Sequence, residues 1–563
     1  MILAALLALL AFPARAVPIL TPAEAFSLGQ VGLVESPDGT VESAASVSSR
    51  AAAAALLAPA LLDGHPDLRR AAVEALGKVG APSDEASLIS AAADPEPAVR
   101  GEAALALFRL VFLKRIPRYS PAAIARLSLL AGDPDPEVRW RTVYAASRWP
   151  EPRLSEVLPN AARDADWRTR LFAVRSLAKL GFAPDPDLLA DPEPYVRAEA
   201  VAAFSAAKAW IRLPDALFGD PSSHVRAAMA DAAAASGDAA RFVPLLERLA
   251  AGPGTLAEGR ALLALAKLLG GASAKVLAEA RQDRRWWLRC RAYEASAGLA
   301  DGPAILLAGA RDADPRVAAQ SLETLAASSP TAALPELQRL LRRPDAPLEL
   351  LGAAVDAAGQ RKDPALLAGL LAATRSKAAK ASPELRGSIR NALAALGPGK
   401  AAAAFKSFPP FVDKPRSFPA LRAPAVIELE TAKGTFVIAL ASGAEASVHA
   451  AAVADGVARG LYDGLNWHRV VTAFVVQGGD PRGSGWGDAG WRLADEDTRR
   501  PFLRGTVGAP KAGKDTAGCQ LFVSLVPIPH LDGRYTAFGT VISGLHVLDL
   551  LEPGDLIVRA RLR

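Results

Sequence analysis

The sequence predicts a multidomain protein in which an all-α solenoid is followed by a smaller β-rich domain. Two observations carry this prediction. A short phrase of Asp, Pro and Arg returns about every 30–40 residues in an Ala- and Leu-rich region, which is the period of a helical solenoid. Further on, residues 467–480 form two short apolar runs around a turn and end in Gly-Gly-Asp, which is typical of paired strands. With 563 residues the chain is also too long for a single core.

Residues 1–16 are a short apolar run that ends in Ala14-Arg15-Ala16, an A-x-A cleavage pattern. The run is too short to predict a membrane span, so we expect a signal peptide over 1–16 and export of a bacterial protein to the periplasm or cell envelope. The alternative is an apolar N-terminal helix on a cytoplasmic protein, and only an uncleaved segment would tether the chain to a membrane. Residues 17–47 form an N-terminal segment, and no other segment is expected to span a membrane.

Residues 48–396 carry the recurring phrase, in which a turn with Asp and Pro precedes an aliphatic-Arg pair and a run of alanines. Clear copies lie at 66–69, 94–100, 133–139, 191–197 and 220–226, and looser ones at 166–170, 283–289 and 314–317. The pattern resembles HEAT repeats of the short bacterial kind, so we expect a HEAT-like α-solenoid here.

The composition of the phrase indicates how the repeats pack. We expect each Asp-Pro to begin a helix, with Asp as the cap and Pro in the first turn. The repeated arginine is expected to reach the acidic cap of an adjacent repeat, and Trp286 and Trp287 are expected to be packing residues. Solenoids present extended surfaces that usually bind protein, which predicts a protein partner without naming it.

Residues 397–423 read as a linker, because Gly397-Pro398-Gly399 ends the last repeat and a proline-rich stretch follows. Its phenylalanines are expected to dock on one domain. The alternative is that the linker binds and occludes a site of its own chain.

The C-terminal region contains several distinctive sequence motifs in a fixed order. These are Trp467-His468-Arg469-Val470-Val471, then Gln477-Gly478-Gly479-Asp480, then Thr516 to Phe522, and finally Leu531-Asp532-Gly533-Arg534-Tyr535 running on to Val541. Together they resemble the cyclophilin family of peptidyl-prolyl cis-trans isomerases, over residues 424–563. The resemblance implies a closed β-barrel with capping helices that rotates X-Pro bonds in protein clients and so assists their folding.

An X-Pro peptide bond is planar, with a rotation barrier of about 18–20 kcal/mol. Its isomerisation makes and breaks no bond, so the site needs no nucleophile, metal or cofactor. It must bury the proline ring and favour the twisted amide. A cation aimed at the proline nitrogen does this, because the twisted nitrogen regains its lone pair, and arginine is always charged.

The resemblance assigns a role to each candidate residue. Arg469 is the catalytic cation, and Gln477 orients it and holds the substrate backbone. The proline pocket and its rim are assigned to Phe474, Val475, Phe522, Leu531, Leu521 and Tyr535, and further substrate contacts to Gln520, Lys511 and His530. His468 points to the opposite strand face and is expected to be structural.

Several positions depart from the family pattern. Trp467 and Leu521 stand where phenylalanine is usual, Val475 where methionine is usual, and Tyr535 where many members have histidine. Pro510-Lys511 replaces an Ala-Asn pair, and His530 replaces the tryptophan that contacts cyclosporin in many members. The pocket is therefore expected to differ in shape and to bind cyclosporin weakly.

Composition excludes several function classes. The net charge of +6 is scattered rather than gathered in a stripe, so nothing indicates nucleic-acid binding. The two cysteines, Cys290 and Cys519, fall in different predicted domains, and Cys519 is expected to be a buried free thiol. The alternative function is a non-catalytic scaffold whose barrel only recognises proline-containing segments, and a third is a structural envelope protein.

Overall fold

The computed structural model describes residues 20–30, 44–397, 418–421, 423–443 and 445–563. The predicted signal peptide over 1–16 lies outside this range and stays a prediction, as does most of the predicted linker. The chain falls into two compact units. The first is Met1–Pro214 with the segments Asp497–Leu503 and Val526–Tyr535, and the second is Asp215–Glu496, Arg504–Leu525 and Thr536–Arg563.

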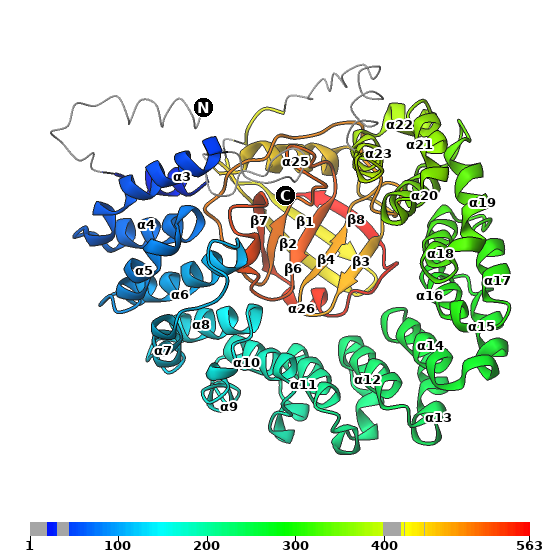
Figure 1. Ribbon diagram of the computed structural model, residues 1–563, viewed down its shortest axis with the longest axis horizontal. Helices are drawn as coiled ribbons and strands as arrows, with labels where there is room; N and C mark the ends of the chain where they lie inside the picture. The colour runs from blue at the N-terminus through cyan, green and yellow to red at the C-terminus, as the bar shows by residue number, and fades with distance from the viewer. Residues whose placement is uncertain (1–19, 31–43, 398–417, 422, 444) are drawn as a thin grey trace. The chain divides into compact units, whose positions relative to one another are not determined.

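The first unit is built on a stack of helices. Helices α4, α6, α8, α10 and α11 pack side by side in chain order, and α5, α7 and α9 form a second row beside them (Figure 1). The stack also includes α2, which precedes residue 48, where the solenoid was predicted to begin. Its Ala25 and Leu28 share a buried core with α4. The helices are α2 Pro22–Gln30, α3 Ala44–Leu57, α4 Pro66–Val79, α5 Glu85–Ala91, α6 Pro97–Phe112, α7 Pro121–Leu130, α8 Pro136–Arg148, α9 Leu158–Ala161, α10 Trp167–Leu180 and α11 Pro194–Ala206.

The second unit begins with the same arrangement. Helices α12, α14, α16, α18, α20 and α23 pack in series, with α13, α15, α17, α19 and α21 alongside. The helices are α12 Ser223–Ser236, α13 Ala239–Ala250, α14 Leu256–Leu269, α15 Ala274–Ala280, α16 Trp286–Ala295, α17 Gly302–Gly309, α18 Pro315–Ser328, α19 Pro330–Leu341, α20 Leu348–Arg361, α21 Leu367–Ala373, α22 Lys377–Ala381 and α23 Pro383–Ala395.

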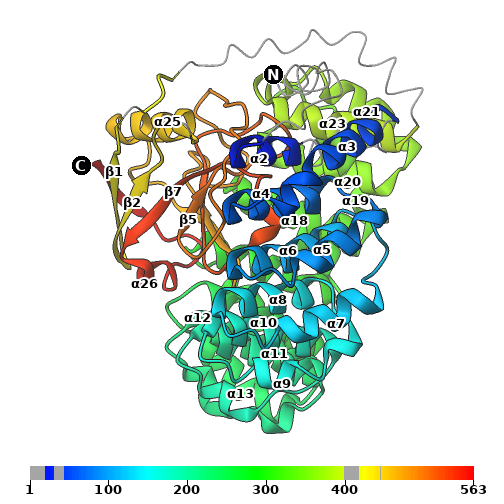
Figure 2. The same cartoon turned by 90° about the vertical axis from the view of Figure 1, so that its left-hand side faces the viewer.

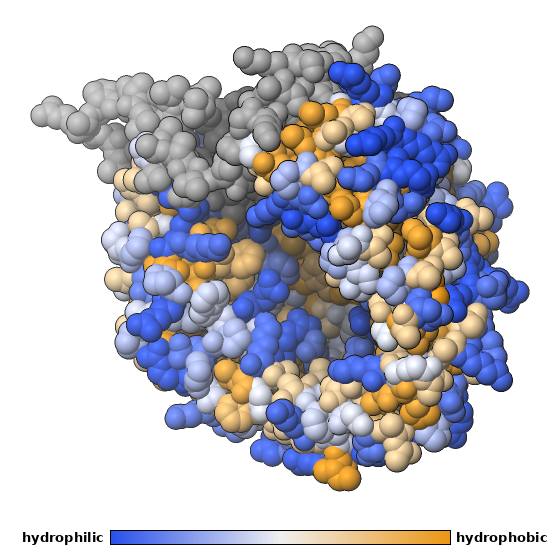
Figure 3. Space-filling view, turned by 45° about the vertical axis from the view of Figure 1, so that its right-hand side comes forward, coloured by the Kyte–Doolittle hydropathy of each residue, from blue (hydrophilic) through white to orange (hydrophobic). Residues whose placement is uncertain are grey.

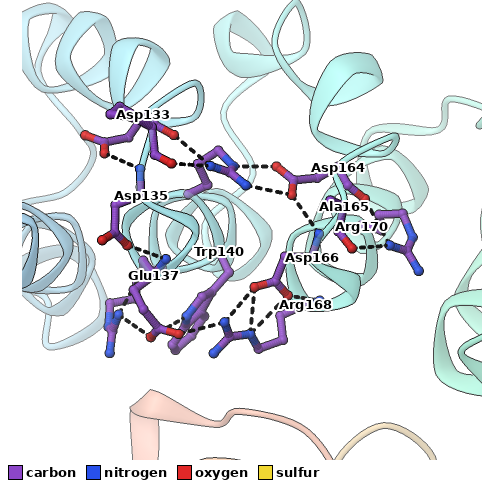
Figure 4. A network of polar contacts seen from close by, with 12 residues as sticks. Asp133, Asp135, Glu137, Trp140, Asp164, Ala165, Asp166, Arg168 and Arg170 are labelled. Carbon is purple, nitrogen blue, oxygen red and sulfur yellow. Dashed lines mark hydrogen bonds and ion pairs between the residues drawn. The ribbon is translucent and has the colours of Figure 1, made fainter.

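Arginine–aspartate pairs join neighbouring repeats, as the sequence predicted, but the aspartate is not the expected cap: Arg139 pairs with Asp164, whereas the cap of α10 is Asp166. Arg139 donates from Nε and Nη2 to both carboxylate oxygens of Asp164, at 2.5 and 3.0 Å. Its Nη1 donates to the carbonyls of Asp133 and Pro134 in its own turn, at 2.9 and 3.0 Å. One guanidinium therefore fixes two successive turns, and Figure 4 shows the continuing network. Equivalent pairs are Arg69–Asp94, Arg100–Asp133, Arg170–Asp191 and Arg289–Asp312.

The expected capping role of the first aspartate is wrong in the doubled Asp-Pro-x-Pro turns. Helix α8 begins at Pro136, and its cap is Asp135, whose side chain accepts from the Glu137 backbone N–H. Asp133 lies two residues earlier, where it accepts from the Asp135 backbone N–H and pairs with Arg100 of the preceding repeat. The second proline starts the helix, because a proline ring is tolerated in the first turn.

Among the residues that the structure describes, one helical run passes a length and composition test for a membrane span, contrary to expectation. It is Leu256–Ala280, with a mean hydropathy of 1.6. Core helices of soluble proteins pass the same test. This run consists of α14, a turn at Gly270–Ser273 and α15, and α14 packs between α12 and α16. We therefore interpret it as part of the stack.

The second unit also contains an eight-stranded antiparallel sheet in the order β3-β4-β6-β5-β7-β2-β1-β8. Its strands are β1 Val426–Thr431, β2 Gly434–Leu440, β3 Trp467–Val471, β4 Val475–Gly478, β5 Thr506–Gly508, β6 Leu521–Ser524, β7 Ala537–Ser543 and β8 Ile557–Leu562. A bridge between Asn466 and Leu556 brings the two end strands together. The sheet is therefore curled into the barrel-like fold that the sequence predicted.

Two helices lie at the ends of this barrel. Helix α25, Ser447–Ala458, contacts β7 and β8, and the short α26, Leu545–Leu548, contacts β2 (Figure 2). The core includes Phe436 and Trp467, whose ring centroids lie 6.0 Å apart. From the end of the predicted linker, Phe418 is buried against Trp491, with ring centroids 5.1 Å apart. This confirms docking for that phenylalanine.

We predict that Arg139→Ala lowers the free energy of unfolding by about 2 kcal/mol, since hydrogen bonds to charged groups contribute about 1.5–3 kcal/mol each. Solenoid repeats contact only their neighbours, so the loss should be local. Hydrogen exchange should rise in α8 and α10 and stay unchanged in α18 and α20.

Arg153→Ala is the matched control, because that arginine pairs with Glu151 while its side chain is 52% exposed. Exposed ion pairs contribute little to stability, so no measurable change in the free energy of unfolding or in hydrogen exchange is expected. Equal effects of the two variants on exchange in α8 would contradict the assigned role of Arg139.

Candidate functional site

The strand register places the main candidate residues on one face of the sheet. Arg469 on β3 lies opposite Gln477 on β4, and Gln477 lies opposite Phe522 on β6. Side chains two residues apart in a strand share a face, so Val475 and Gln520 belong to the same side. The structure therefore brings together Arg469, Val475, Gln477, Gln520 and Phe522, as the sequence predicted.

The turn between β3 and β4 adds Phe474 to this face. Ala473 has a positive φ of 51°, and the Phe474 backbone N–H donates to the Val471 carbonyl at 3.1 Å. The turn brings the Phe474 ring to within 5.9 Å of the Arg469 guanidinium carbon. A cation and an aromatic wall are thus held beside each other on an accessible surface, because Arg469 is exposed.

Three side chains are joined by hydrogen bonds in a line. Arg469 Nη1 donates to Gln477 Oε1 at 3.5 Å, and Gln477 Nε2 donates to Gln520 Oε1 at 3.0 Å. Gln520 Nε2 donates to the carbonyls of Gly485 and Gly487, at 2.8 and 3.0 Å. These bonds orient both amides, so that the oxygen of Gln477 faces the arginine and the oxygen of Gln520 faces Gln477.

A cavity of about 120 Å³ opens beside the two glutamines. Pro510 and Lys511 line it, and the substrate contact expected of Lys511 stays a prediction. The Lys511 ammonium pairs with Asp495 at 2.6 Å, and Arg492, which also lines the cavity, pairs with Asp488 at 3.3 Å. The cavity is therefore polar, while the face carrying Phe474 and Phe522 is aromatic.

The expected rim position of Leu521 is wrong. Its strand neighbour Phe522 lies opposite Gln477, whereas Leu521 lies opposite Gly478. Adjacent strand residues point to opposite faces, so the Leu521 side chain points away from the Arg469 face and is buried, with 2% exposed.

Leu531, His530 and Tyr535 lie in the segment Val526–Tyr535 of the first unit. Leu531 is buried, and His530 meets a partner that the sequence did not predict. The hydroxyl of Tyr144 on α8 lies 2.8 Å from His530 Nδ1 and accepts from the His530 backbone N–H at 3.2 Å. Burial and nearby arginines lower the pKa of His530 to about 3. The substrate-contacting roles of these three residues stay predictions.

Other titratable groups near the face are structural. His468 is buried, as expected from its strand position, and burial lowers its pKa to about 4. Cys519 is a free, buried thiol, also as expected, and burial raises its pKa to about 12. In the part of the chain that the structure describes, no three His, Cys, Asp or Glu residues are grouped to hold a metal ion.

The loop after β4 was not among the predicted site residues. Asp480 is buried and accepts from the backbone N–H groups of Arg482, Ser484 and Gly485, at 2.7, 2.9 and 2.5 Å. This closes the loop that presents the Gly485 and Gly487 carbonyls to Gln520. The glycine-rich run from Gly478 to Gly490 was the available signal, since closely spaced glycines indicate tight backbone turns.

Comparisons with known proteins give a consistent result. The family model "Cyclophilin type peptidyl-prolyl cis-trans isomerase/CLD" matches residues 426–560, and a HEAT-repeat model matches residues 39–108 and 121–190. A peptidyl-prolyl cis-trans isomerase of Helicobacter pylori is 47% identical over 102 residues, which is 17% of this chain and 63% of that protein. Peptidyl-prolyl cis-trans isomerase B of Bacillus subtilis is 42% identical over 104 residues, which is 18% of this chain and 73% of that protein.

This chain thus spans less than two thirds of the length of the Helicobacter pylori relative. A crystal structure of a cyclophilin-type peptidyl-prolyl cis-trans isomerase from Cryptosporidium parvum aligns at 24% identity with a TM-score of 0.24, covering 25% of this chain and 98% of that one.

We predict that the ring of His468 titrates with a midpoint near pH 4, because burial and the charge of Arg469 disfavour its protonated form. Its pKa is lowered by folding, so it contributes stability above about pH 6.5 that is lost as the pH falls toward 4. Nitrogen-15 histidine NMR, with His468 assigned by substitution, measures the midpoint. A midpoint at pH 6 or above in the folded protein would contradict the prediction.

Proposed function

The chain belongs to the cyclophilin-type peptidyl-prolyl cis-trans isomerase family, and on this premise we propose that its C-terminal domain rotates X-Pro bonds in protein clients. The observation that carries the proposal is the shared sheet face of Arg469, Gln477 and Phe522. It puts a permanent cation beside an aromatic surface, which is what this reaction requires.

The mechanism follows from the charge distribution of a twisted amide. The proline ring packs against Phe474 and Phe522, and this contact holds the ring while the preceding carbonyl rotates. When resonance is lost, the proline nitrogen regains a lone pair, and the Arg469 guanidinium donates to it. The planar forms offer no such lone pair, so the interaction is stronger in the transition state than in either ground state.

Gln477 supports this step in two ways. Its carbonyl oxygen accepts from Arg469 and limits the directions in which the guanidinium points. Being half-buried at the edge of the polar cavity, it also binds the substrate backbone before the proline. The cavity beside it, with Lys511 and Gln520, receives the residues that precede the X-Pro bond.

The HEAT-like solenoid supports a role in recruiting the client or a partner protein. On the face drawn in Figure 3, hydrophilic and hydrophobic side chains are interspersed. Large apolar side chains are exposed at scattered points of the described helices and turns, such as Leu129, Ile211 and Leu371. A bound client has a raised local concentration at the catalytic domain, so a protein client should be accelerated more than a short peptide.

We predict that Arg469→Ala lowers kcat/KM for a short Ala-Pro peptide by about 100-fold, the size of effect seen when one transition-state donor is removed. The measurement is NMR exchange spectroscopy with the full chain. Arg459→Ala is the control, because Arg459 forms an exposed pair with Asp455 on α25.

The same variant separates the catalytic from the binding alternative. A catalyst loses turnover on a protein client, whereas a module that only recognises proline segments shows no turnover in the wild type and keeps its client affinity in Arg469→Ala. No acceleration by a folded wild-type chain would overturn the proposed activity.

We also predict that the full chain accelerates proline-limited refolding of a protein client by a larger factor than exchange in the short peptide. Excess Arg469→Ala chain should compete for the client and slow refolding without slowing the peptide reaction. Equal acceleration of both substrates, with no competition, would argue against recruitment by the solenoid.

A further inference from the structure

A solenoid helix holds the loop that follows β4. Glu349 on α20 accepts from Arg482 Nε at 2.5 Å and Nη2 at 2.9 Å, and from Ser484 Oγ at 3.2 Å. Helix and loop belong to the same compact unit. The Glu349 side chain is 2% exposed, whereas that of Arg482 is 46% exposed. A buried carboxylate thus meets an arginine that reaches in from the catalytic domain.

The same helix receives a second side chain of this loop. Trp486 packs against the hydrophobic core around α20, directly over Gly352. A Cβ atom at position 352 would lie 2.7 Å from the Trp486 ring, closer than such contacts allow. Glu349 and Gly352 are three residues apart and therefore neighbours on one helix face. One face of α20 thus holds the loop at two points.

The opposite side of the loop reaches the catalytic face. The carbonyls of Gly485 and Gly487 both accept from Gln520 Nε2, which leaves Gln520 Oε1 to accept from Gln477 Nε2. Gln477 must then present its oxygen to Arg469. If Gln520 turned its amide over, Gln477 would turn too, and an NH₂ group would face the guanidinium. Two donors facing each other repel rather than bond.

We propose that Glu349 is a positioning residue for the reaction of the catalytic domain. By fixing the 482–486 loop, it sets the orientation of the Gln520 and Gln477 amides and, through them, the direction of the Arg469 guanidinium. The inference rests on the proposed function. It makes the solenoid part of the machinery that orients the catalytic arginine, in addition to any binding of clients.

The electrostatics of the pair suit a fixed anchor. Burial alone raises the pKa of Glu349, but hydrogen bonds from Arg482 and Ser484 and the charge of Arg482 outweigh it, so the pKa lies below the ordinary value. Glu349 is therefore ionised at neutral pH, and its bonds to the arginine are charge-assisted and bidentate. Such a pair fixes the orientation of the Arg482 side chain as well as its distance from Glu349, and both are needed to hold the loop in one position.

The test uses the full chain with Glu349→Gln, which keeps the shape of the side chain and removes its charge. Misorientation of a catalytic group by a fraction of an ångström is costly, so we expect kcat for an Ala-Pro peptide to fall about tenfold. KM should change less than kcat, because Phe474 and Phe522, against which the proline ring packs, are not part of this line of side-chain hydrogen bonds. The side-chain amide resonances of Gln477 and Gln520, assigned by substitution, should shift.

Glu336→Gln is the matched control. Glu336 is also a buried solenoid carboxylate paired with an arginine, but its partner Arg339 is on the same helix, α19. It should leave kcat and both amide resonances unchanged. Arg482→Met removes the same ion pair by changing its partner on the loop, where the arginine is partly exposed. It should reproduce the loss of kcat. The double variant should lose no more than either single variant, because both act through one pair.

The outcomes separate this inference from the proposed function. An active wild type, with Glu349→Gln and Arg482→Met matching it in kcat and in both amide resonances, would overturn the positioning role. If no variant and no wild-type chain shows exchange, the proposed function fails, and the amide resonances alone decide the inference. Shifted resonances in Glu349→Gln support it, and unshifted ones overturn it.

Discussion

The structure depends on the pairing of an arginine fork with a carboxylate at the turns of the solenoid. Alanine-rich helices bury little side-chain surface each, so the direction in which one repeat follows another needs a further constraint. The arginine of each phrase supplies it by bonding two carbonyls of its own turn and both oxygens of an aspartate in the next. The bond is planar and bidentate, so it sets an orientation and not only a distance.

The same chemistry connects solenoid helices to loops of the C-terminal domain. Within the second unit, Glu349 holds Arg482. Within the first unit, Arg109 of α6 lies 3.9 Å from Asp532, and the Phe502 backbone N–H donates to that carboxylate. Burial raises the pKa of Asp532 to about 7, against the opposing charge of Arg109. Loops of the C-terminal domain are thus tied to helices far away along the chain.

Much of the fold could be predicted because its signals are local. The repeated phrase, the Gly-Gly-Asp stop after β4 and the alternation along β3 each act within a few residues. The prediction that Arg469, Gln477 and Phe522 lie together agrees with the strand register, while their roles stay predictions. The site prediction was wrong for Leu521, because a shift of one residue along a strand moves a side chain to the other face.

Contacts between segments that are distant in the sequence could not be predicted from it. Glu349 and Arg482 are 133 residues apart, and Tyr144 and His530 are 386 apart. Neither pair belongs to a motif, and a glutamate inside an alanine-rich helix has the same local pattern whether it faces solvent or a loop. The capping error at Asp133 has a similar origin, because only the position of Arg100 shows why a second aspartate is needed.

The most direct test of the central claim is a crystal structure of the full chain with an Ala-Pro peptide bound. We expect the proline ring to lie against Phe474 and Phe522, with the Arg469 guanidinium directed at the proline nitrogen and Gln477 Oε1 still facing that guanidinium. A peptide bound elsewhere, or a proline nitrogen out of reach of Arg469, would contradict it.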